Sequence, residues 1–504
     1  MKVVLISTYE LGHQPFGLAS PAAWLREAGA EVTCLDLSRE ALPEEAVRSA
    51  DLVGFYVPMH TATRLAIQRL GRVRELNPRA HLCFYGLYAP LNESYLRRLG
   101  AQTILGGEFE EGLVALVKRL ASGKASDSPS CAKATEGEQP EPVVSTARQR
   151  FRVPDRSGLP DLSRYARLEL ANGARRIVGY TEASRGCKHL CRHCPIVPVY
   201  QGRFRIVQRE IVLADIRQQV AAGAEHITFG DPDFFNGIGH SLAIVEALRR
   251  EHPRVTYDVT IKVAHLLRYA HLIERLRESG CLFVTSAVEC LDDRVLRLLD
   301  KGHTREDFLR VVELFHEVGL ALSPTFIPFH PWTTVEGYRE MLTLLAELGL
   351  AESVAPVQLA IRLLIPAESK LLELPELRAR IGEFDEQELS YRWTHADPRV
   401  ERLYRDVRTI LAAGGAAAQS EPRAPALSEA EGSASGLARA ARPPLPHGGD
   451  SDFSPRAPLR RTEIFAQVWE SARRAGGEPL DTIFPTAILP ARATIPYLTE
   501  PWFC

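Results

Sequence analysis

The chain has 504 residues, 45% of them hydrophobic, a size that indicates more than one domain with sizeable cores. Its formal net charge is −2, so no global basic field indicates a nucleic-acid or membrane partner, and we expect neither. No apolar stretch approaches the roughly 20 residues of a membrane-spanning helix. The opening run Lys2–Ser7 is typical of a strand rather than of a signal peptide. The nine cysteines are mostly scattered singly, which predicts a reducing, cytoplasmic location.

Residues 1–120 alternate short apolar runs with helical patterns, which predicts a doubly wound, Rossmann-like α/β domain. Ligands of such domains bind beyond the carboxyl ends of the strands. The expected strands are Lys2–Ser7, Glu31–Leu37, Leu52–Val57, His81–Tyr85 and Gln102–Leu105. Residues 121–160 are rich in Ser, Pro and acidic residues, and this composition predicts a linker.

Residues 161–370 alternate again and predict a partial (β/α)6 barrel of the TIM type, with its active site at the carboxyl-end mouth. The expected strands are Ile177–Glu182, His226–Gly230, Thr256–Ile261, Leu282–Val288, Ala321–Ile327 and Pro356–Arg362. A small C-terminal extension follows. It comprises a helical segment over 371–413, a low-complexity, disordered insertion over 414–458, and a last segment over 459–504 with a helix at Thr462–Arg474.

Three cysteines, Cys187, Cys191 and Cys194, lie on one short loop directly after the first barrel strand. Three thiolates so spaced can bind one face of an iron–sulfur cube and leave the fourth iron open to another ligand. A Cys3His zinc site that uses His189 or His193 is the alternative. A disulfide is disfavoured because an odd number of thiols sits on a loop too tight to pair them.

The stretch Ser184–Pro195 resembles the signature of the radical S-adenosylmethionine (SAM) family, CxxxCxxC with His193 before the last cysteine. The resemblance implies a [4Fe–4S] cluster whose open iron chelates SAM. An electron from a reductant such as flavodoxin or ferredoxin then cleaves SAM and releases a 5′-deoxyadenosyl radical. The protein's own work is to hold the cofactor, aim the radical and exclude water.

Polar residues follow several barrel strands, where the family would bind SAM. The segment with Asp231 and Asp233 resembles the one that receives the SAM ammonium group, and we place Asp231 ahead of Asp233. A Pro-centred turn with Asp caps explains the same residues. The resemblance puts Glu289 near the ribose or methionine moiety, and Lys262 points to the same mouth. Lys301 is equally well explained as part of a helix C-cap.

Substrate-pocket candidates are harder to separate from ordinary structure. They are His330 and Trp332 after the fifth strand, Arg362 on the sixth, and the segment Trp393–Asp397, and for the last two we favour a structural role.

The N-terminal domain resembles the cobalamin-binding domain found ahead of many radical SAM barrels. The resemblance rests on Gly107-Glu108 after the fifth strand, and it puts Met59 and Gly86 at the ends of the third and fourth strands near the corrin. The Asp-x-His-x-x-Gly loop whose His ligates cobalt is absent, and His13 lacks the partnering Asp. A cobalamin held without a protein ligand and a domain that binds none both remain open.

Several phrases, among them Ile227–Phe235, Phe329–Thr333 and Tyr497–Cys504, resemble the radical SAM proteins with a Cys/selenocysteine-Ala-Glu-Pro tail (CUAEP or CCAEP). In that family a second cysteine or a selenocysteine follows the position of Cys504. Two interpretations therefore stay open: the natural protein continues through a UGA codon, or Cys504 is an ordinary terminal cysteine without a partner.

The sequence leaves three classes of function open. The first is a radical SAM enzyme with cobalamin, for methylation or another radical modification of an unknown substrate. The second is a radical SAM enzyme whose N-terminal domain is a scaffold or docking module, and the third is a non-catalytic, metal-stabilised binding protein. Methylthiotransfer to tRNA is a weaker variant, since Cys34 and Cys83 supply no second cluster triad.

Overall fold

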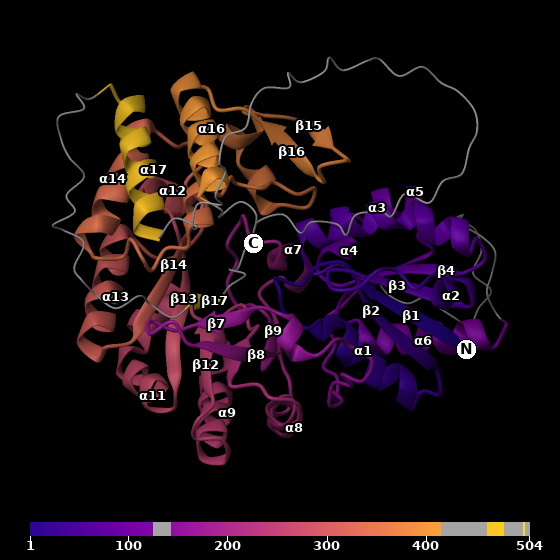
Figure 1. Cartoon of the computed structure of the whole chain (residues 1–504). Coiled ribbons are helices and arrows are strands. Elements are labelled where there is room, and N and C mark those ends of the chain that lie inside the picture. Colours follow the sequence, from indigo (N-terminus) through magenta and orange to yellow (C-terminus); the bar gives the residue numbers. More distant parts are fainter. Residues whose placement is uncertain (124–142, 415–460, 478–496, 499–504) are drawn as a thin grey trace, which may run out of the picture.

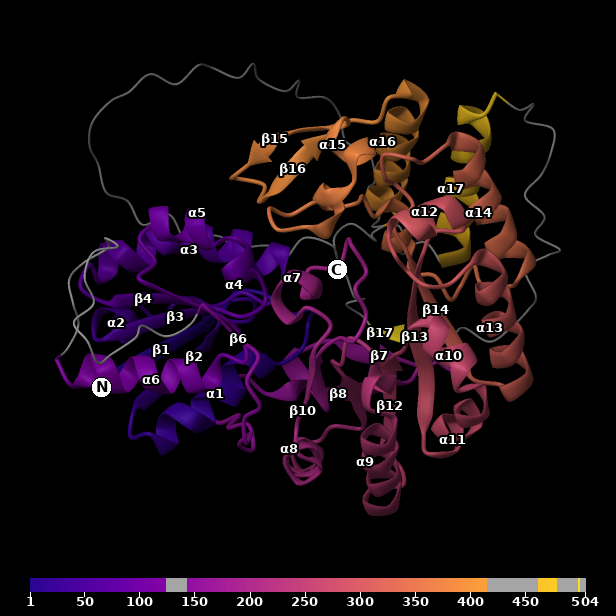
Figure 2. The same ribbon diagram turned by 180° about the vertical axis from the view of Figure 1, so that it is seen from behind.

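The computed structural model describes residues 1–123, 143–414, 461–477 and 497–498. The N-terminal domain and the barrel lie side by side, and the C-terminal extension lies above both (Figures 1 and 2). No helix among these residues is long and apolar enough to cross a membrane. The predicted insertion, apart from Gly414, and the terminal Cys504 lie outside the described residues.

The N-terminal domain is a parallel sheet in the order β2-β1-β3-β4-β5-β6, covered by helices on both faces (Figure 1). Alternate residues of each strand point to opposite faces, so β1 places Val4 and Ile6 in one core and Val3 and Leu5 in the other. The predicted Rossmann-like domain is confirmed. Its strands are β1 (Lys2–Ser7), β2 (Glu31–Asp36), β3 (Leu52–Tyr56), β4 (His81–Tyr85), β5 (Thr103–Gly107) and β6 (Val144–Ser145). Its helices are α1 (Phe16–Glu27), α2 (Glu44–Arg48), α3 (His60–Leu76), α4 (Tyr88–Leu91), α5 (Glu93–Arg98) and α6 (Glu110–Ala121).

The second domain is a curled half-barrel sheet in the order β14-β13-β12-β11-β8-β7-β17, parallel from β8 to β14. Helices pack on its outer face around one large apolar core. Its strands are β7 (Arg167–Glu169), β8 (Arg175–Thr181), β11 (His226–Phe229), β12 (Thr256–Thr260), β13 (Cys281–Glu289), β14 (Ala321–Phe326) and β17 (Tyr497–Leu498). Its helices are α8 (Arg209–Ala221), α9 (Ile238–Glu251), α10 (Val263–Arg268), α11 (Ile273–Glu278), α12 (Asp293–Leu298), α13 (Arg305–Val318) and α14 (Val335–Glu347).

The predicted sixth barrel strand, Pro356–Arg362, is wrong. Most of it forms the 3-10 helix η4 (Pro356–Ala360), and only an isolated bridge joins Arg362 to Phe329. Proline at the first position has no N–H to give to a sheet and its φ suits a helical turn. The Gln358 side chain accepts the Phe326 N–H at 3.1 Å, so a side chain satisfies the edge of β14.

The segment predicted as a linker, 121–160, is ordered in its described part and joins the two domains. β6 extends the N-terminal sheet by pairing with β5, and Phe151 is buried in the barrel core. Gly107 permits the pairing because its φ is +69° and a Cβ there would lie 2.1 Å from the Ser145 carbonyl oxygen.

The extension predicted as helical over 371–413 also contains a hairpin, formed by β15 (Ile381–Asp385) and β16 (Ser390–Trp393), before α16 (Pro398–Ala413). The hairpin reaches the N-terminal domain, where Arg64 pairs with Glu388 at 3.1 Å. The predicted last helix is present as α17 (Arg461–Ala475), which packs beside α14 and α16.

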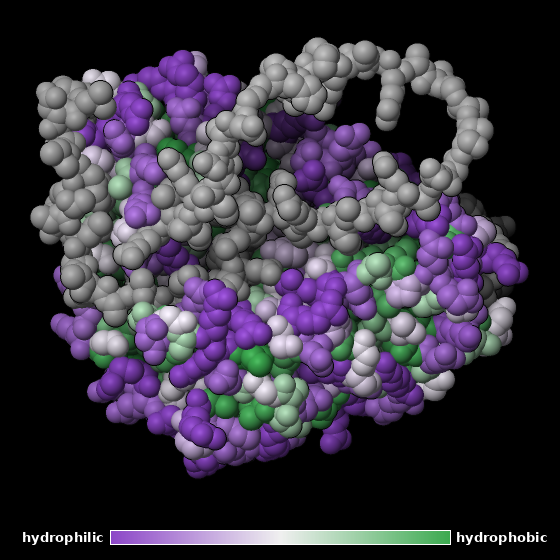
Figure 3. Space-filling model, viewed as in Figure 1, coloured by the Kyte–Doolittle hydropathy of each residue, from purple (hydrophilic) through white to green (hydrophobic). Residues whose placement is uncertain are grey.

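The described surface mixes hydrophilic and hydrophobic residues on the face shown in Figure 3. The large hydrophobic side chains exposed among the described residues are Val144, Val153, Leu190 and Ile206.

Candidate functional site

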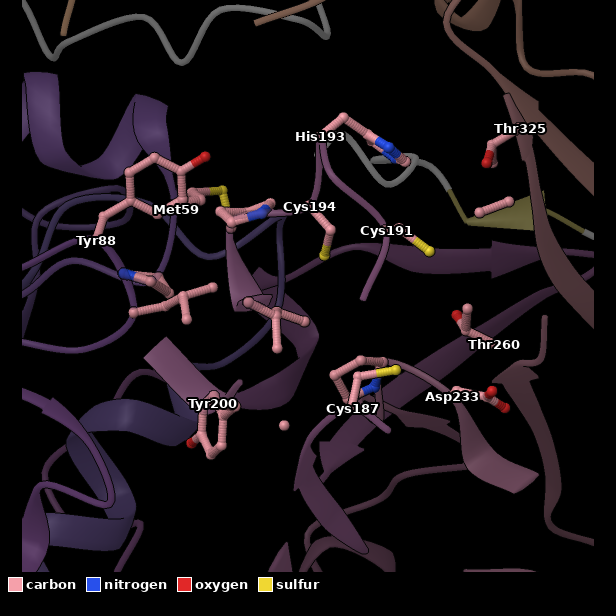
Figure 4. Close-up of a pocket in the computed structure, with 18 of the residues that line it drawn as sticks. Met59, Tyr88, Cys187, Cys191, His193, Cys194, Tyr200, Asp233, Thr260 and Thr325 are labelled. Carbon is pink, nitrogen blue, oxygen red and sulfur yellow. The ribbon is translucent and has the colours of Figure 1, made fainter. Parts of the chain in front are cut away.

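A cavity of about 330 Å³ opens between the barrel mouth and the N-terminal domain (Figure 4). The strand ends of the barrel and the loops of the N-terminal sheet meet there, and each fold binds its ligands at that end of its strands. The residues that line it include Glu10, His13, Met59, Leu87, Tyr88, Gly107, Tyr180, Glu182, Ser184, Arg185, Cys187, His189, Cys191, His193, Cys194, Asp233, Lys262, Glu289, Lys301 and Arg362.

The cysteine loop is anchored by a short hairpin of β9 (Ser184–Gly186) and β10 (Phe204–Ile206). The sulfur atoms of Cys187, Cys191 and Cys194 face a common space in Figure 4, and all three thiols are free. Burial raises the pKa of the Cys194 thiol to about 12 and also raises the pKa of Cys187. The metal-free thiols of Cys187 and Cys194 therefore hold their protons, and a metal must displace them on binding.

The two aspartates after β11 play different parts. Asp231 does not line the cavity: its carboxylate accepts the Ala183 N–H at 2.9 Å and the Ser184 hydroxyl at 2.6 Å. Burial raises its pKa to about 7 in spite of these bonds. It therefore holds the base of the cysteine loop.

Asp233 is the aspartate that faces the cavity. It caps the 3-10 helix η2 (Phe234–Gly237), and its Oδ2 lies 3.1 Å from His189 Nε2 and 2.7 Å from His265 Nδ1. Burial alone would raise its pKa, but the two imidazoles hold it below the usual value. Sequence analysis ranked Asp231 ahead of Asp233 as the candidate for the SAM ammonium group, whereas the structure has Asp233 and not Asp231 facing the cavity.

A second charged group lies on the opposite side of the cysteines. Glu289, at a left-handed φ of +69°, accepts from Lys301 Nζ at 3.1 Å and contacts His193 Nε2 at 3.1 Å. Against the effect of burial, Lys301 and His193 lower the Glu289 pKa to about 2. Lys262 Nζ lies 3.6 Å from Cys191 Sγ, so both lysines put positive charge beside the thiols.

The cysteine loop is tied to the N-terminal domain by a buried ionic cluster centred on Arg185. Its guanidinium pairs with Glu110 at 2.8 and 2.9 Å and with Glu182 at 2.6 Å, and lies 3.5 Å from Glu108. Glu108, predicted beside the corrin, is thus turned away from the cavity, and burial raises its pKa to about 7. Sequence analysis missed Arg185, since its partners Glu108 and Glu110 lie more than 70 residues away.

Three of the four remaining residues predicted near the corrin line the cavity, and one does not. His13 and Met59 line the cavity, as does Gly107. Gly86, at φ +112°, does not; a Cβ there would lie 3.1 Å from the Tyr56 ring.

The substrate-pocket candidates are mostly structural. His330 and Trp332 are buried off the cavity. Arg362 lines it, but its guanidinium pairs with Glu401 at 2.9 Å and stacks 3.7 Å from the Trp393 ring. Asp397 caps α16.

Among the described residues, one group of side chains could hold a zinc ion. Ligand atoms of Cys187, His189 and Asp233 lie within 4.8 Å of one another, whereas the three cysteines offer the all-sulfur face of a cluster.

Comparison with known proteins identifies the central part of the chain. Residues 181–345 match the radical SAM superfamily and form a radical SAM domain. The tRNA-2-methylthio-N(6)-dimethylallyladenosine synthase of Thermobifida fusca is 28% identical over 190 residues, 34% of this chain and 36% of that protein. The hopanoid C-3 methylase of Methylococcus capsulatus is 25% identical over 327 residues, 63% of this chain and 62% of that protein. This chain covers less than two thirds of either relative's length.

Comparison of folds finds a similarity that covers both domains of this chain. The cobalamin-dependent SAM radical enzyme OxsB, solved with aqua-cobalamin and SAM bound, superposes with a TM-score of 0.64 over 83% of this chain and 67% of that one, at 15% identity. The likeness shows that a Rossmann-like domain followed by a half-barrel is a known arrangement.

Proposed function

We propose that this protein is a cobalamin-dependent radical SAM enzyme. The observation that carries the proposal is the single cavity that brings the three thiols, the charged strand ends of a radical SAM domain and the loops of the N-terminal domain together. The substrate is unknown, and methylation is the modification that the methylase relative favours.

The residues of the cavity fit the proposed cofactors. Three free thiols that face one space suit a [4Fe–4S] cluster with one open iron. When bound, the cluster supplies the electron that cleaves SAM, and a flavodoxin or ferredoxin is the proposed reductant. The apolar side chains of Met59, Leu87 and Tyr88 form a wall against which a corrin would lie, and His13, whose Nε2 has no protein partner, lines the same cavity.

The chain's own side chains take defined roles in this proposal. Asp233, held ionised by two imidazoles, receives the SAM ammonium group, because a cation in a buried pocket needs a carboxylate partner. The Glu289–Lys301 pair and Lys262 orient the methionine carboxylate and the ribose by charge. The buried walls exclude water from the radical.

Anaerobic reconstitution of the full chain, followed by assays of iron, cobalt and 5′-deoxyadenosine, tests the proposal. Cys187→Ala, Cys191→Ala and Cys194→Ala should each lose the iron chromophore and SAM cleavage. Cys290→Ala, a cysteine off the cavity, is the matched control and should retain both. A triad variant that keeps full iron and activity would sink the idea, and iron without cobalt would reduce the N-terminal domain to a scaffold.

A zinc-stabilised binding protein is the second candidate, favoured by the Cys187, His189 and Asp233 grouping. It predicts about one zinc and no iron in the same assay.

We place the chain, by its internal phrases Ile227–Phe235 and Phe329–Thr333, with the CUAEP/CCAEP-tail radical SAM proteins of the cytoplasm. Reading the gene after the Cys504 codon tests the placement. UGA or a cysteine codon, followed by Ala-Glu-Pro codons, supports it, and UAA or UAG contradicts it.

A further inference from the structure

The loop after β1 brings two buried polar side chains to the N-terminal wall of the cavity. Glu10 is 6% exposed and His13 is 3% exposed, and both line the cavity. A tight turn between them, closed by the His13 N–H to the Glu10 carbonyl at 2.8 Å, uses left-handed backbone at Leu11 (φ +50°) and Gly12 (φ +75°). A non-glycine residue in this region is strained, and such strain is concentrated at ligand sites.

Each of these side chains has one buried atom without a protein partner. One Glu10 oxygen accepts the Phe16 backbone N–H, while Oε2 has no partner, and His13 Nε2 has none either. Among the described N-terminal residues that line the cavity, these two carry such atoms. A buried polar atom left unpaired is costly, so both atoms indicate a ligand that supplies hydrogen bonds.

The charge state of the pair restricts that ligand. Burial, with Glu182 and Asp36 nearby, raises the Glu10 pKa well above its usual value, which favours the protonated, neutral carboxyl. Its proton sits on Oε2, because the other oxygen accepts from Phe16. Burial lowers the His13 pKa to about 4, so the imidazole is neutral too. A carboxyl O–H donor and a neutral imidazole carried by one tight turn complement a group that has both an acceptor and a donor but no charge.

We infer that Glu10 and His13 form a subsite for an uncharged primary carboxamide, carried by a corrin bound against the N-terminal domain. The inference rests on the proposed function, since the periphery of cobalamin bears primary carboxamides. His13 then acts as a hydrogen-bond partner of the corrin periphery and not as a cobalt ligand. His13 packs 4.8 Å from Tyr180 of the barrel, measured between ring centroids, so the subsite also touches the barrel.

The test measures the dissociation constant of hydroxocobalamin for the full chain by equilibrium dialysis, together with the visible spectrum of the bound corrin. Glu10→Ala and His13→Ala should each weaken binding about 10-fold, the value of one buried hydrogen bond. Glu10→Gln, which keeps a donor, should bind like the parent. Ser7→Ala removes a buried, unpartnered hydroxyl at the end of the same strand but off the cavity, and should change nothing.

The outcomes separate the subsite from the wider proposal. A parent that binds corrin while both alanine variants bind it equally well overturns the subsite, whose atoms then face ordered water only or another ligand. A changed spectrum in His13→Ala makes His13 a cobalt ligand and overturns it as well. A parent that binds no corrin fails the proposed function itself. Should an alanine variant not fold, Glu10→Met and His13→Phe keep the volume without the hydrogen-bonding atom and carry the same expectations.

Discussion

Replacing Arg185 tests whether the buried ionic cluster holds the cysteine loop between the two domains. Arg185→Met removes a buried cation from between three carboxylates, those of Glu108, Glu110 and Glu182. Its side chain is 7% exposed and those of Glu108 and Glu110 are 1% and 0% exposed. Breaking a buried ion pair by removing one partner costs about 3–5 kcal/mol, because the other charge is left unpaired. We expect Arg185→Met to lower the free energy of unfolding by about 4 kcal/mol.

A double variant separates the charge from the shape of the side chain. Adding Glu110→Gln removes the carboxylate with two contacts to Arg185 and should recover about 1–2 kcal/mol, the size of coupling between contacting residues. Urea unfolding of the metal-free chain measures both changes. Arg97→Met breaks an exposed helical pair with Glu93 and should cost no more than about 0.5 kcal/mol. If Arg185→Met costs as little as Arg97→Met, the cluster does not hold the domains together.

The remaining predictions concern single positions. Asp233→Asn should weaken SAM binding about 10-fold or more with the iron content unchanged, whereas Asp231→Asn should mainly lower the thermal midpoint; equal SAM affinity in the parent and Asp233→Asn would refute the ammonium site. Gly107→Ala should destabilise the chain by about 1–3 kcal/mol through its left-handed φ and the approach of Ser145, and an unchanged melting curve would contradict this. Burial lowers the His330 pKa to about 4, so the unfolded chain binds the extra proton between pH 4 and its usual value of 6.5. Stability should therefore fall as the pH drops through that window, and His330→Gln should flatten the curve of urea midpoint against pH.

The sequence predicted the parts that local pattern controls. Alternating apolar runs predicted both domains, and the cysteine spacing placed three thiols at the end of the first barrel strand. The run Pro356–Arg362 was misread because a short apolar run fits a strand and a helical turn equally well.

Contacts between residues far apart in the chain could not be predicted from the sequence. Asp231 and Asp233 lie two residues apart, and only the fold decides that one supports Ser184 while the other meets His265 from α10. Lys301 was explained as a helix end, although its ammonium is buried against Glu289. In each case the partner is set by how strand ends converge, and that convergence leaves no local signature.

Anomalous diffraction at the iron, cobalt and zinc absorption edges, from anaerobically grown crystals of the reconstituted chain, tests the central claim most directly. The account predicts an iron signal among Cys187, Cys191 and Cys194 and a cobalt signal in the same cavity, on the side of His13 and Met59. A zinc signal between Cys187, His189 and Asp233, or cobalt outside the cavity, would contradict it.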